Sequence, residues 1–251
     1  MAGKQKIVVR DVSKKYRLFS NKTDRLVASL LPFMKGSHDE FFALKNIHFT
    51  ANEGDIVGIV GKNGSGKSTL LKIISGITTP TSGNCQTFGK VIPLIELGAG
   101  FHPELTGREN IYFYTSLLGF KKHEMNGVAE DVIAFADIGR FIDQPVKMYS
   151  SGMKARLSFS VSVFINPDIL IVDEILAVGD ESFRNKSNEK LKSLFQSGKT
   201  ILLVTHSLGA VASLCNRAVL MDQGRLIEDG QPQDIIKQYL ELNRQPQTWN
   251  G

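Results

Sequence analysis

One short stretch of the chain has the residue types and spacing that bind phosphate. It is the run Gly61, Lys62, Asn63, Gly64, Ser65, Gly66, Lys67 and Ser68, which matches the pattern GxxxxGKS. The glycines let backbone N–H groups curl around an anion, the lysine reaches the terminal phosphates, and the serine offers its hydroxyl to Mg²⁺. A strand-like run, DIVGIV, precedes it, and a helical run, TLLKII, follows from Thr69. The context therefore favours a phosphate-binding loop over an idle glycine-rich turn.

A second group of chemical residues follows the apolar run Ile169–Val172. Asp173 and Glu174 stand at its carboxyl end, where parallel sheets bind their ligands. Alone, such a pair is more often a solvated strand end than a site. Beside a phosphate loop it indicates hydrolysis, with Asp173 holding Mg²⁺ and Glu174 polarising the attacking water.

The elements that position these residues alternate between short apolar runs and helical patterns. The runs are residues 7–12, 55–60, 168–174, 200–206 and 217–222. Continuous apolar strands between helices predict a parallel sheet covered on both faces, and so an α/β fold.

The middle of the chain departs from this alternation. Residues 106–165 contain helical patterns and no convincing strand. Thr106 followed by Glu109 predicts a capped helix start, and Ser151 opens a run in which Leu157 and Val161 share one helix face. We expect one domain over 1–251, with an inserted helical subdomain at about 103–165.

Residues 17–40 fit neither pattern. Leu26, Val27, Leu30 and Leu31 have the spacing of a short amphipathic helix among basic residues. A membrane or partner contact and a surface hairpin that covers the domain's own core remain equal alternatives. Residues 243–251 are expected to be a short polar tail.

The composition is that of an ordinary globular protein. Of 251 residues, 42% are hydrophobic and 22% are charged, and the formal net charge is +5. Such a surplus is more often a solvated surface than a face for nucleic acid or anionic lipid. Cys85 and Cys215 are too few and too separate for a disulfide framework or a metal cluster. Apolar runs well short of roughly 20 residues, and a start without a secretory pattern, predict a cytosolic chain.

Together these motifs resemble the nucleotide-binding subunit of ATP-binding-cassette (ABC) transporters, from about Ile7 to Leu240. The family's LSGGQ signature has its counterpart in the run Tyr149, Ser150, Ser151, Gly152 and Met153, where Ser150 and Gly152 agree. Without the resemblance, these residues would be an ordinary helix N-cap. In the family this loop clasps the γ-phosphate held by the other subunit. The resemblance therefore implies a P-loop NTPase core of the ABC ATPase fold with a β-rich N-terminal part, ATP and Mg²⁺ as cofactors, and a homodimer.

The resemblance also assigns roles to single positions. His206 stands where the family has a switch histidine, so the implied catalytic residues are Glu174, His206 and Lys67. Tyr16 is the candidate for stacking on adenine. Glu96 replaces a glutamine that senses Mg²⁺. In the run 177–180 only Asp180 keeps the family's form.

Three strings narrow the resemblance to one branch of the family. They are ELGAGFHPELTGREN at 96–110, YSSGM followed by RLSFSV within 149–161, and VDEILAVGD at 172–180. They look like the branch that exports lipid-linked polysaccharide. O-antigen is the first expectation, with teichoic acid or capsule as alternatives. This implies a peripheral subunit at the cytoplasmic face of the inner membrane, on two copies of a membrane-spanning permease. No carbohydrate-binding domain is expected after about residue 240.

Two other classes of protein share part of this pattern. A soluble cassette ATPase, acting in cofactor assembly or on nucleic acid, would have the same nucleotide motifs but leaves the exporter-like strings unexplained. A P-loop kinase needs neither the signature segment nor the switch histidine. We therefore expect no nucleic-acid partner.

Overall fold

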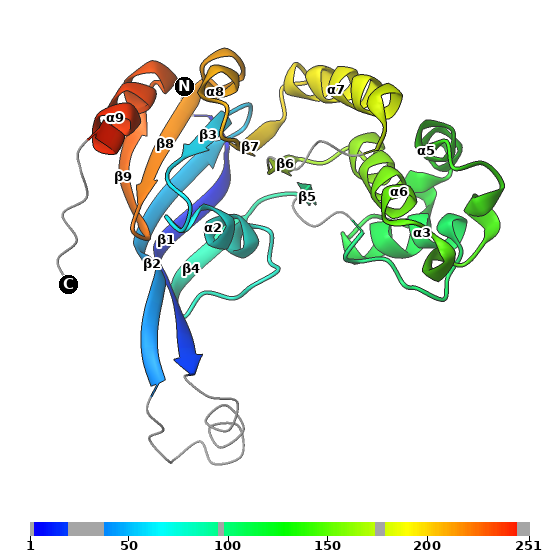
Figure 1. Cartoon of the computed structure of the whole chain (residues 1–251), viewed down its shortest axis with the longest axis horizontal. Helices are drawn as coiled ribbons and strands as arrows, with labels where there is room; N and C mark the ends of the chain where they lie inside the picture. The colour runs from blue at the N-terminus through cyan, green and yellow to red at the C-terminus, as the bar shows by residue number, and fades with distance from the viewer. Residues whose placement is uncertain (1–2, 20–37, 95–97, 174–178, 245–251) are drawn as a thin grey trace.

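Two β-sheets form the centre of the molecule (Figure 1). The structure is a computed structural model, and it describes residues 3–19, 38–94, 98–173 and 179–244. The smaller sheet is antiparallel, in the order β2-β1-β4, and consists of β1 (Gln5–Phe19), β2 (His38–Asn52) and β4 (Ser82–Thr87). The larger sheet has the order β5-β6-β7-β3-β8-β9. Its strands are β3 (Ile56–Val60), β5 (Val91–Leu94), β6 (Ile169–Val172), β7 (Thr200–Val204), β8 (Arg217–Asp222) and β9 (Arg225–Gly230).

The larger sheet confirms the predicted α/β class. Strands β5, β6, β7, β3 and β8 are parallel, and only the edge strand β9 runs against its neighbour. Both faces are covered. Val57 and Ile59 pack with Leu70 and Leu71 of α2 (Lys67–Ile74), whereas Val60 lies in a second core cluster on the opposite face. Burial on both faces is why these strands have continuous apolar sequences.

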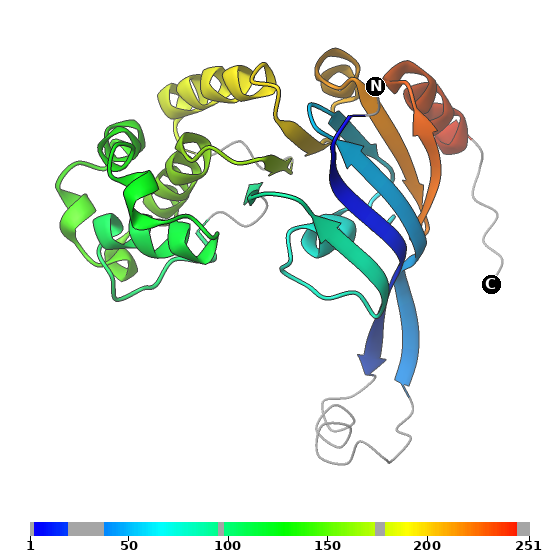
Figure 2. The ribbon, with the colours of Figure 1, turned by 180° about the vertical axis from the view of Figure 1, so that it is seen from behind.

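One strand prediction was wrong. Residues 7–12 belong to the antiparallel sheet, between β2 and β4 (Figure 2). Their apolar run looks like that of a parallel strand because a central strand is buried whatever the direction of its neighbours. A β-rich N-terminal part was expected, but no residue range was predicted for four strands: β2, β4, β5 and β9. Strand β4, for example, has the sequence SGNCQT and is largely exposed, so it gives no apolar signal.

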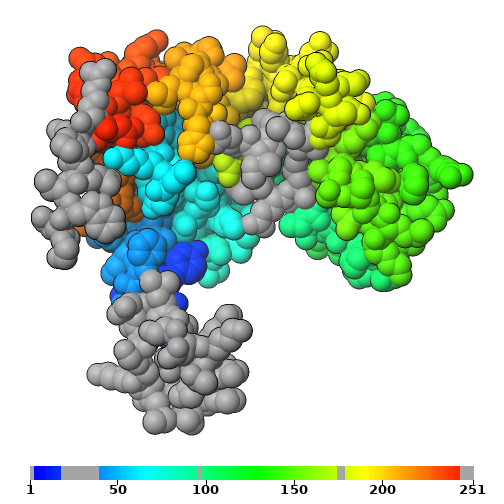
Figure 3. Space-filling view, viewed as in Figure 1, coloured from blue at the N-terminus to red at the C-terminus, as the bar shows by residue number. Residues whose placement is uncertain are grey.

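The helices between β5 and β6 lie to one side of the sheets (Figures 1 and 2). They are α3 (Gly107–Leu117), α4 (Lys122–Met125), α5 (Ala129–Ala136) and α6 (Ser151–Phe164), with short 3₁₀ turns at Gly139–Asp143 and Val146–Met148. Helix α3 begins with the predicted capping box, in which Thr106 and Glu109 bond to each other's backbone N–H. In the space-filling view these helices form one end of the molecule (Figure 3).

The remaining helices are α7 (Glu181–Phe195), α8 (Leu208–Leu214) and α9 (Pro232–Arg244). Helix α9 includes Asn243 and Arg244, which were expected to begin a polar tail. The expected segment 17–40 is also shorter than predicted, because β1 continues to Phe19 and β2 begins at His38, with Arg17 paired to Glu40. The proposed helix around Leu26 lies outside the described residues. Within the described ranges, no helix combines the length and apolar character that a membrane crossing requires.

Candidate functional site

The phosphate loop joins β3 to α2. At the start of α2, its backbone N–H groups are not bonded to any capping side chain. Gly66 is the N-cap of α2 and has a φ of 104°. The backbone N–H groups of the first turn therefore keep their capacity to bind an anion. Lys67 is only 8% exposed, and its ammonium donates to the carbonyls of Gly61 at 2.6 Å and Lys62 at 2.9 Å. A buried cation is thus already in place at the helix N-terminus.

Two glycines of this loop are required by close packing. A Cβ on Gly61 would clash with the carbonyl oxygen of Met221, and one on Gly66 would lie 2.6 Å from the carbonyl oxygen of Ala43. Gly66 also needs the left-handed backbone region that other residues avoid. The loop is further tied to the end of β8, because the N–H of Gly224 donates to the carbonyl of Ser65 at 3.0 Å.

A cavity of about 290 Å³ opens above this loop. It is lined by Tyr16, Phe41, Ala43, Asn63, Gly64, Gly66, Lys67, Ser68, Thr69, Asp173, Val204 and His206. Asp173 and His206 come from the carboxyl ends of β6 and β7, the edge at which parallel sheets bind ligands. The structure thus brings most of the expected nucleotide residues to one cavity. Gly61 and Ser65 of the same loop are buried and do not line the cavity. Glu96 and Glu174 lie outside the described residues.

The donor set of this cavity suits a nucleoside triphosphate with Mg²⁺. Lys67 and the uncapped first turn of α2 supply positive charge for phosphates. Ser68 and Asp173 supply hydroxyl and carboxylate oxygens, the hard ligands that Mg²⁺ prefers. These residues fit both cofactors.

Sequence reasoning missed an aromatic residue at the cavity mouth. Tyr16 of β1 is paired directly with Phe41 of β2, so both rings project from the same face of the sheet. Both line the cavity and remain exposed, at 40% and 48%. Only the strand register places Phe41 beside Tyr16, and that register was not predicted. The two rings offer a platform on which a nucleobase can stack.

Replacing Phe41 with Ala is expected to weaken ATP binding by about 1 kcal/mol, roughly fivefold, because one stacking surface is lost. Equilibrium binding of ATP and of inorganic tripolyphosphate, which has no base, measures the effect. Tripolyphosphate affinity should not change. Phe42→Ala is the matched control, since Phe42 does not line the cavity and instead lies under the Lys15 ammonium. Equal losses for both ligands would assign Phe41 a purely structural role.

The signature segment lies elsewhere in the molecule. Ser150 is the N-cap of α6 and accepts a hydrogen bond from the N–H of Met153 at 3.1 Å, while Ser151 opens the helix. Ser150 and Ser151 are exposed, and neither they nor Gly152 lines the cavity over the phosphate loop. Both ribbon views show α6 apart from α2 (Figures 1 and 2). Within one chain, the signature and the phosphate loop do not form one site.

Tyr149, a departure from the family's signature, has a definite structural role. Its hydroxyl donates to the carbonyl of Phe141 at 2.6 Å and accepts from the N–H of Gly107 at the start of α3. Burial raises the pKa of this phenol to about 12, so it stays protonated and keeps both bonds at neutral pH. Tyr149 thereby fixes the signature to the first turn of α3.

Arg156 of α6 is a second linking residue that sequence reasoning missed. Its guanidinium donates to the carbonyl of Ala136 at 2.9 Å and to the Asp137 carboxylate at 3.0 Å. It also lies 3.7 Å from the carboxylate of Asp180, which caps α7 through the N–H of Phe183. Arg156 connects the signature helix to the segment that follows the Asp173 strand.

Comparison with known proteins finds relatives that are named as an ABC transporter protein or as ATP-binding proteins of export systems. The chain is 46% identical to the ABC transporter protein AbcA of Aeromonas salmonicida, over 94% of this chain and 76% of the relative. It is 45% identical to the O-antigen export system ATP-binding protein RfbB of Myxococcus xanthus, over 94% of this chain and 55% of the relative, and so spans about half of that protein. It is 43% identical to the teichoic acids export ATP-binding protein TagH of Staphylococcus haemolyticus, over 92% of this chain and 86% of the relative.

The fold agrees with these relatives. A dimeric ATP-binding cassette, solved in a post-hydrolysis state with ADP and Pi, superposes with a TM-score of 0.67 at 22% identity, over 90% of this chain and 98% of the other. The family model for ABC transporters matches residues 44–177, which include the phosphate loop and the signature. With these matches, and with a phosphate loop and an Asp173 strand built as described above, the chain belongs to the ABC transporter family as one of its ATP-binding cassettes.

Proposed function

We propose that this chain hydrolyses ATP to drive export of a lipid-linked polysaccharide across the cytoplasmic membrane, with O-antigen as the first candidate. One observation carries the proposal: relatives named for O-antigen export and for teichoic acid export both align over nine tenths of this chain at 43–45% identity. A teichoic acid or capsule polymer is the alternative substrate of the same machine.

The chain's own residues divide the work of hydrolysis among them. Lys67 and the first turn of α2 bind the phosphates. Ser68 and Asp173 would hold Mg²⁺, which would supply positive charge to offset that of the phosphates. Glu174, the residue after Asp173, accepts the proton of the attacking water. His206 orients the γ-phosphate and that water. Glu96 stands in place of the glutamine with which the family senses Mg²⁺.

The second half of each ATP site is supplied by a second copy of the chain. Ser150, Ser151 and Gly152 are proposed to bind the γ-phosphate held by the partner's phosphate loop. Two observations support this: these residues are accessible at the start of α6, and they do not line their own chain's cavity. Residues 103–165, approximately, are then a helical subdomain within a single cassette domain, and its function is to present the signature.

The partner in the membrane is proposed to be a spanning permease in two copies, with this chain bound peripherally at the cytoplasmic face. The support is that the relatives are named as ATP-binding proteins of export systems, which implies a separate membrane component. The transported substrate is the lipid-linked glycan, and nucleic acid has no role.

Membrane fractionation tests this assignment. Coexpressed with its permease, the chain should sediment with membranes, and without the permease it should stay in the supernatant. Lys67→Ala is the control, because a nucleotide-site variant should still sediment. A chain that stays in the supernatant in both cases would favour a soluble cassette ATPase.

A further inference from the structure

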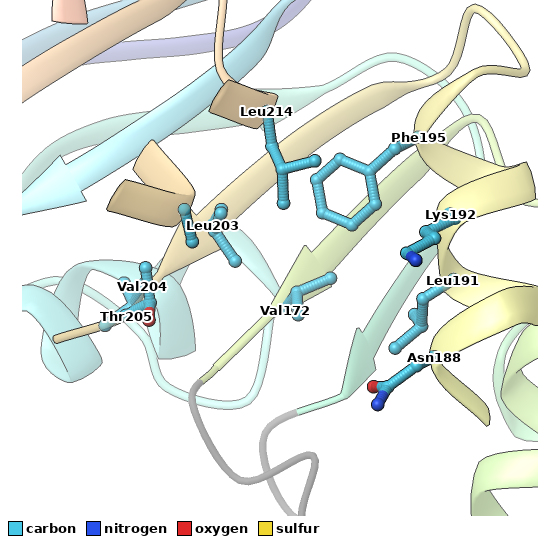
Figure 4. A pocket seen from close by; sticks show the side chains of 10 residues that line it. Val172, Asn188, Leu191, Lys192, Phe195, Leu203, Val204, Thr205 and Leu214 are labelled. Carbon is cyan, nitrogen blue, oxygen red and sulfur yellow. The ribbon is translucent and has the colours of Figure 1, made fainter. Parts of the chain in front are cut away.

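A second pocket lies behind the ATP cavity, between α7, α8 and the strands β6 and β7 (Figure 4). Its volume is about 310 Å³, at the lower end of the range of small-molecule sites. It is lined by Val172, Asn188, Leu191, Lys192, Phe195, Leu203, Val204, Thr205, Ala210 and Leu214. We call it the α7–α8 pocket.

The lining of the α7–α8 pocket is apolar with a cationic edge. In Figure 4 the Phe195 ring and the Leu214 side chain face each other across the pocket, and the Lys192 ammonium points into it. None of the lining residues is acidic. Lys192 is exposed and has no ion pair with any carboxylate in the described part of the chain. The pocket therefore favours a molecule with an apolar body and one negative group.

A polar side chain next to Lys192 adds to the preference of the pocket for an anion. The Asn188 side chain projects into the pocket beside Lys192, and its amide can donate two hydrogen bonds. An anionic oxygen bound by Lys192 would thus find the Asn188 amide as a further donor nearby. Thr205, whose Oγ1 accepts from the N–H of Ser207 at 3.1 Å, lies beside Val204 at the other end of the pocket.

The α7–α8 pocket borders the ATP cavity. Val204 lines both. Val172 and Thr205 line the α7–α8 pocket, and the residues that follow each of them, Asp173 and His206, line the ATP cavity. A molecule that shifts the ends of β6 and β7 therefore moves two groups of the nucleotide site.

From this geometry we infer that the α7–α8 pocket binds a small amphipathic anion, and that its occupancy changes the affinity of the cassette for ATP. The binding itself does not depend on the proposed export function. The coupling does rest on ATP binding at the phosphate loop, and by thermodynamic linkage ATP must change the affinity for the anion by the same factor.

Two fluorescent probes that differ in one group test the binding. Anilinonaphthalene sulfonate has three aromatic rings and a sulfonate, and N-phenyl-1-naphthylamine is the same molecule without the sulfonate. Titration of the full chain should show both probes binding, with the sulfonate tighter. Lys192→Gln should weaken the sulfonate about two- to fivefold, the value of an exposed ion pair, and leave the neutral probe unchanged.

Substitutions of residues that line the α7–α8 pocket test whether the probes bind there and not elsewhere on the chain. Ala210→Phe should weaken both probes at least tenfold, and Leu214→Ser, at a partly exposed position that tolerates polarity, should weaken both to a lesser degree. The controls are Lys186→Gln, which lies against Phe183 on the same helix, and Ala212→Phe on the exposed face of α8. Neither control should change either probe. Unchanged binding in Ala210→Phe and Leu214→Ser would overturn the site.

The coupling is tested with ATP. Saturating ATP should change the affinity for the sulfonate probe about fivefold or more, and Lys67→Ala should abolish that change while retaining probe binding. An ATP effect that is absent from the wild-type chain would overturn the coupling. Loss of probe binding in Lys67→Ala would instead assign the probe to the ATP cavity. Failure of the export proposal would leave the probe results unaffected.

Discussion

Replacing Glu174 with Gln is expected to slow ATP hydrolysis by roughly 10²–10⁴-fold while ATP binding stays intact. The physical reason is that glutamine keeps the size of the side chain but cannot accept the proton of the attacking water. Asp173, Lys67 and Ser68, which bind the phosphates and Mg²⁺ in this account, are unchanged. Binding and chemistry should therefore separate.

Phosphate release and equilibrium ATP binding, measured on the same preparation, check this result. Glu181→Gln is the matched control, since Glu181 is an exposed carboxylate in the first turn of α7 and should change neither quantity. Near-normal turnover in Glu174→Gln would remove Glu174 from the role of base.

Lys67→Ala should abolish ATP binding, with a loss of roughly 10²-fold or more. The buried ammonium now held by the carbonyls of Gly61 and Lys62 is the charge that phosphates would bind, and charge-assisted contacts of this kind are worth about 1.5–3 kcal/mol each. Lys62→Ala is the control, because the Lys62 side chain does not line the cavity. Retained ATP affinity would contradict the assignment of the phosphate loop.

Lys67→Ala, combined with a variant of the signature, also tests whether two copies of the chain share each ATP site. Gly152→Asp places a negative charge at the signature and should block hydrolysis in a homodimer, as Lys67→Ala does. A mixed dimer of the two variants retains one intact site, made of Lys67 from the first chain and the signature of the second. It should recover ATPase activity that neither homodimer has. A mixed dimer as inactive as both parents would argue against a shared site.

The residues that could be predicted from sequence are those held by local motifs. The phosphate loop, Asp173 and His206 each follow an apolar strand, and short apolar strands in a parallel sheet bring their carboxyl ends to one edge. The alternating strands and helices gave the correct fold class for the same reason. The capping box at Thr106 is equally local, because its two partners are three residues apart.

The features that escaped prediction depend on contacts between distant residues. Phe41 reaches the ATP cavity through its register with Tyr16, 25 residues earlier, and its strand has no uniform apolar pattern. Tyr149 is held by Gly107 and Phe141, and Arg156 by the end of α5 and Asp180. Residues 7–12 were assigned to the wrong sheet because burial alone does not reveal the direction of neighbouring strands.

The central claim is that ATP hydrolysis by this chain drives polysaccharide export, and surface polymer in a deletion strain tests it most directly. Cells that lack the gene should lose the polymer from their surface and accumulate it on its lipid carrier inside. The wild-type chain should restore export, and Glu174→Gln, expressed to the same level, should not. Normal surface polymer in the deletion strain, or in cells with only Glu174→Gln, would contradict the account.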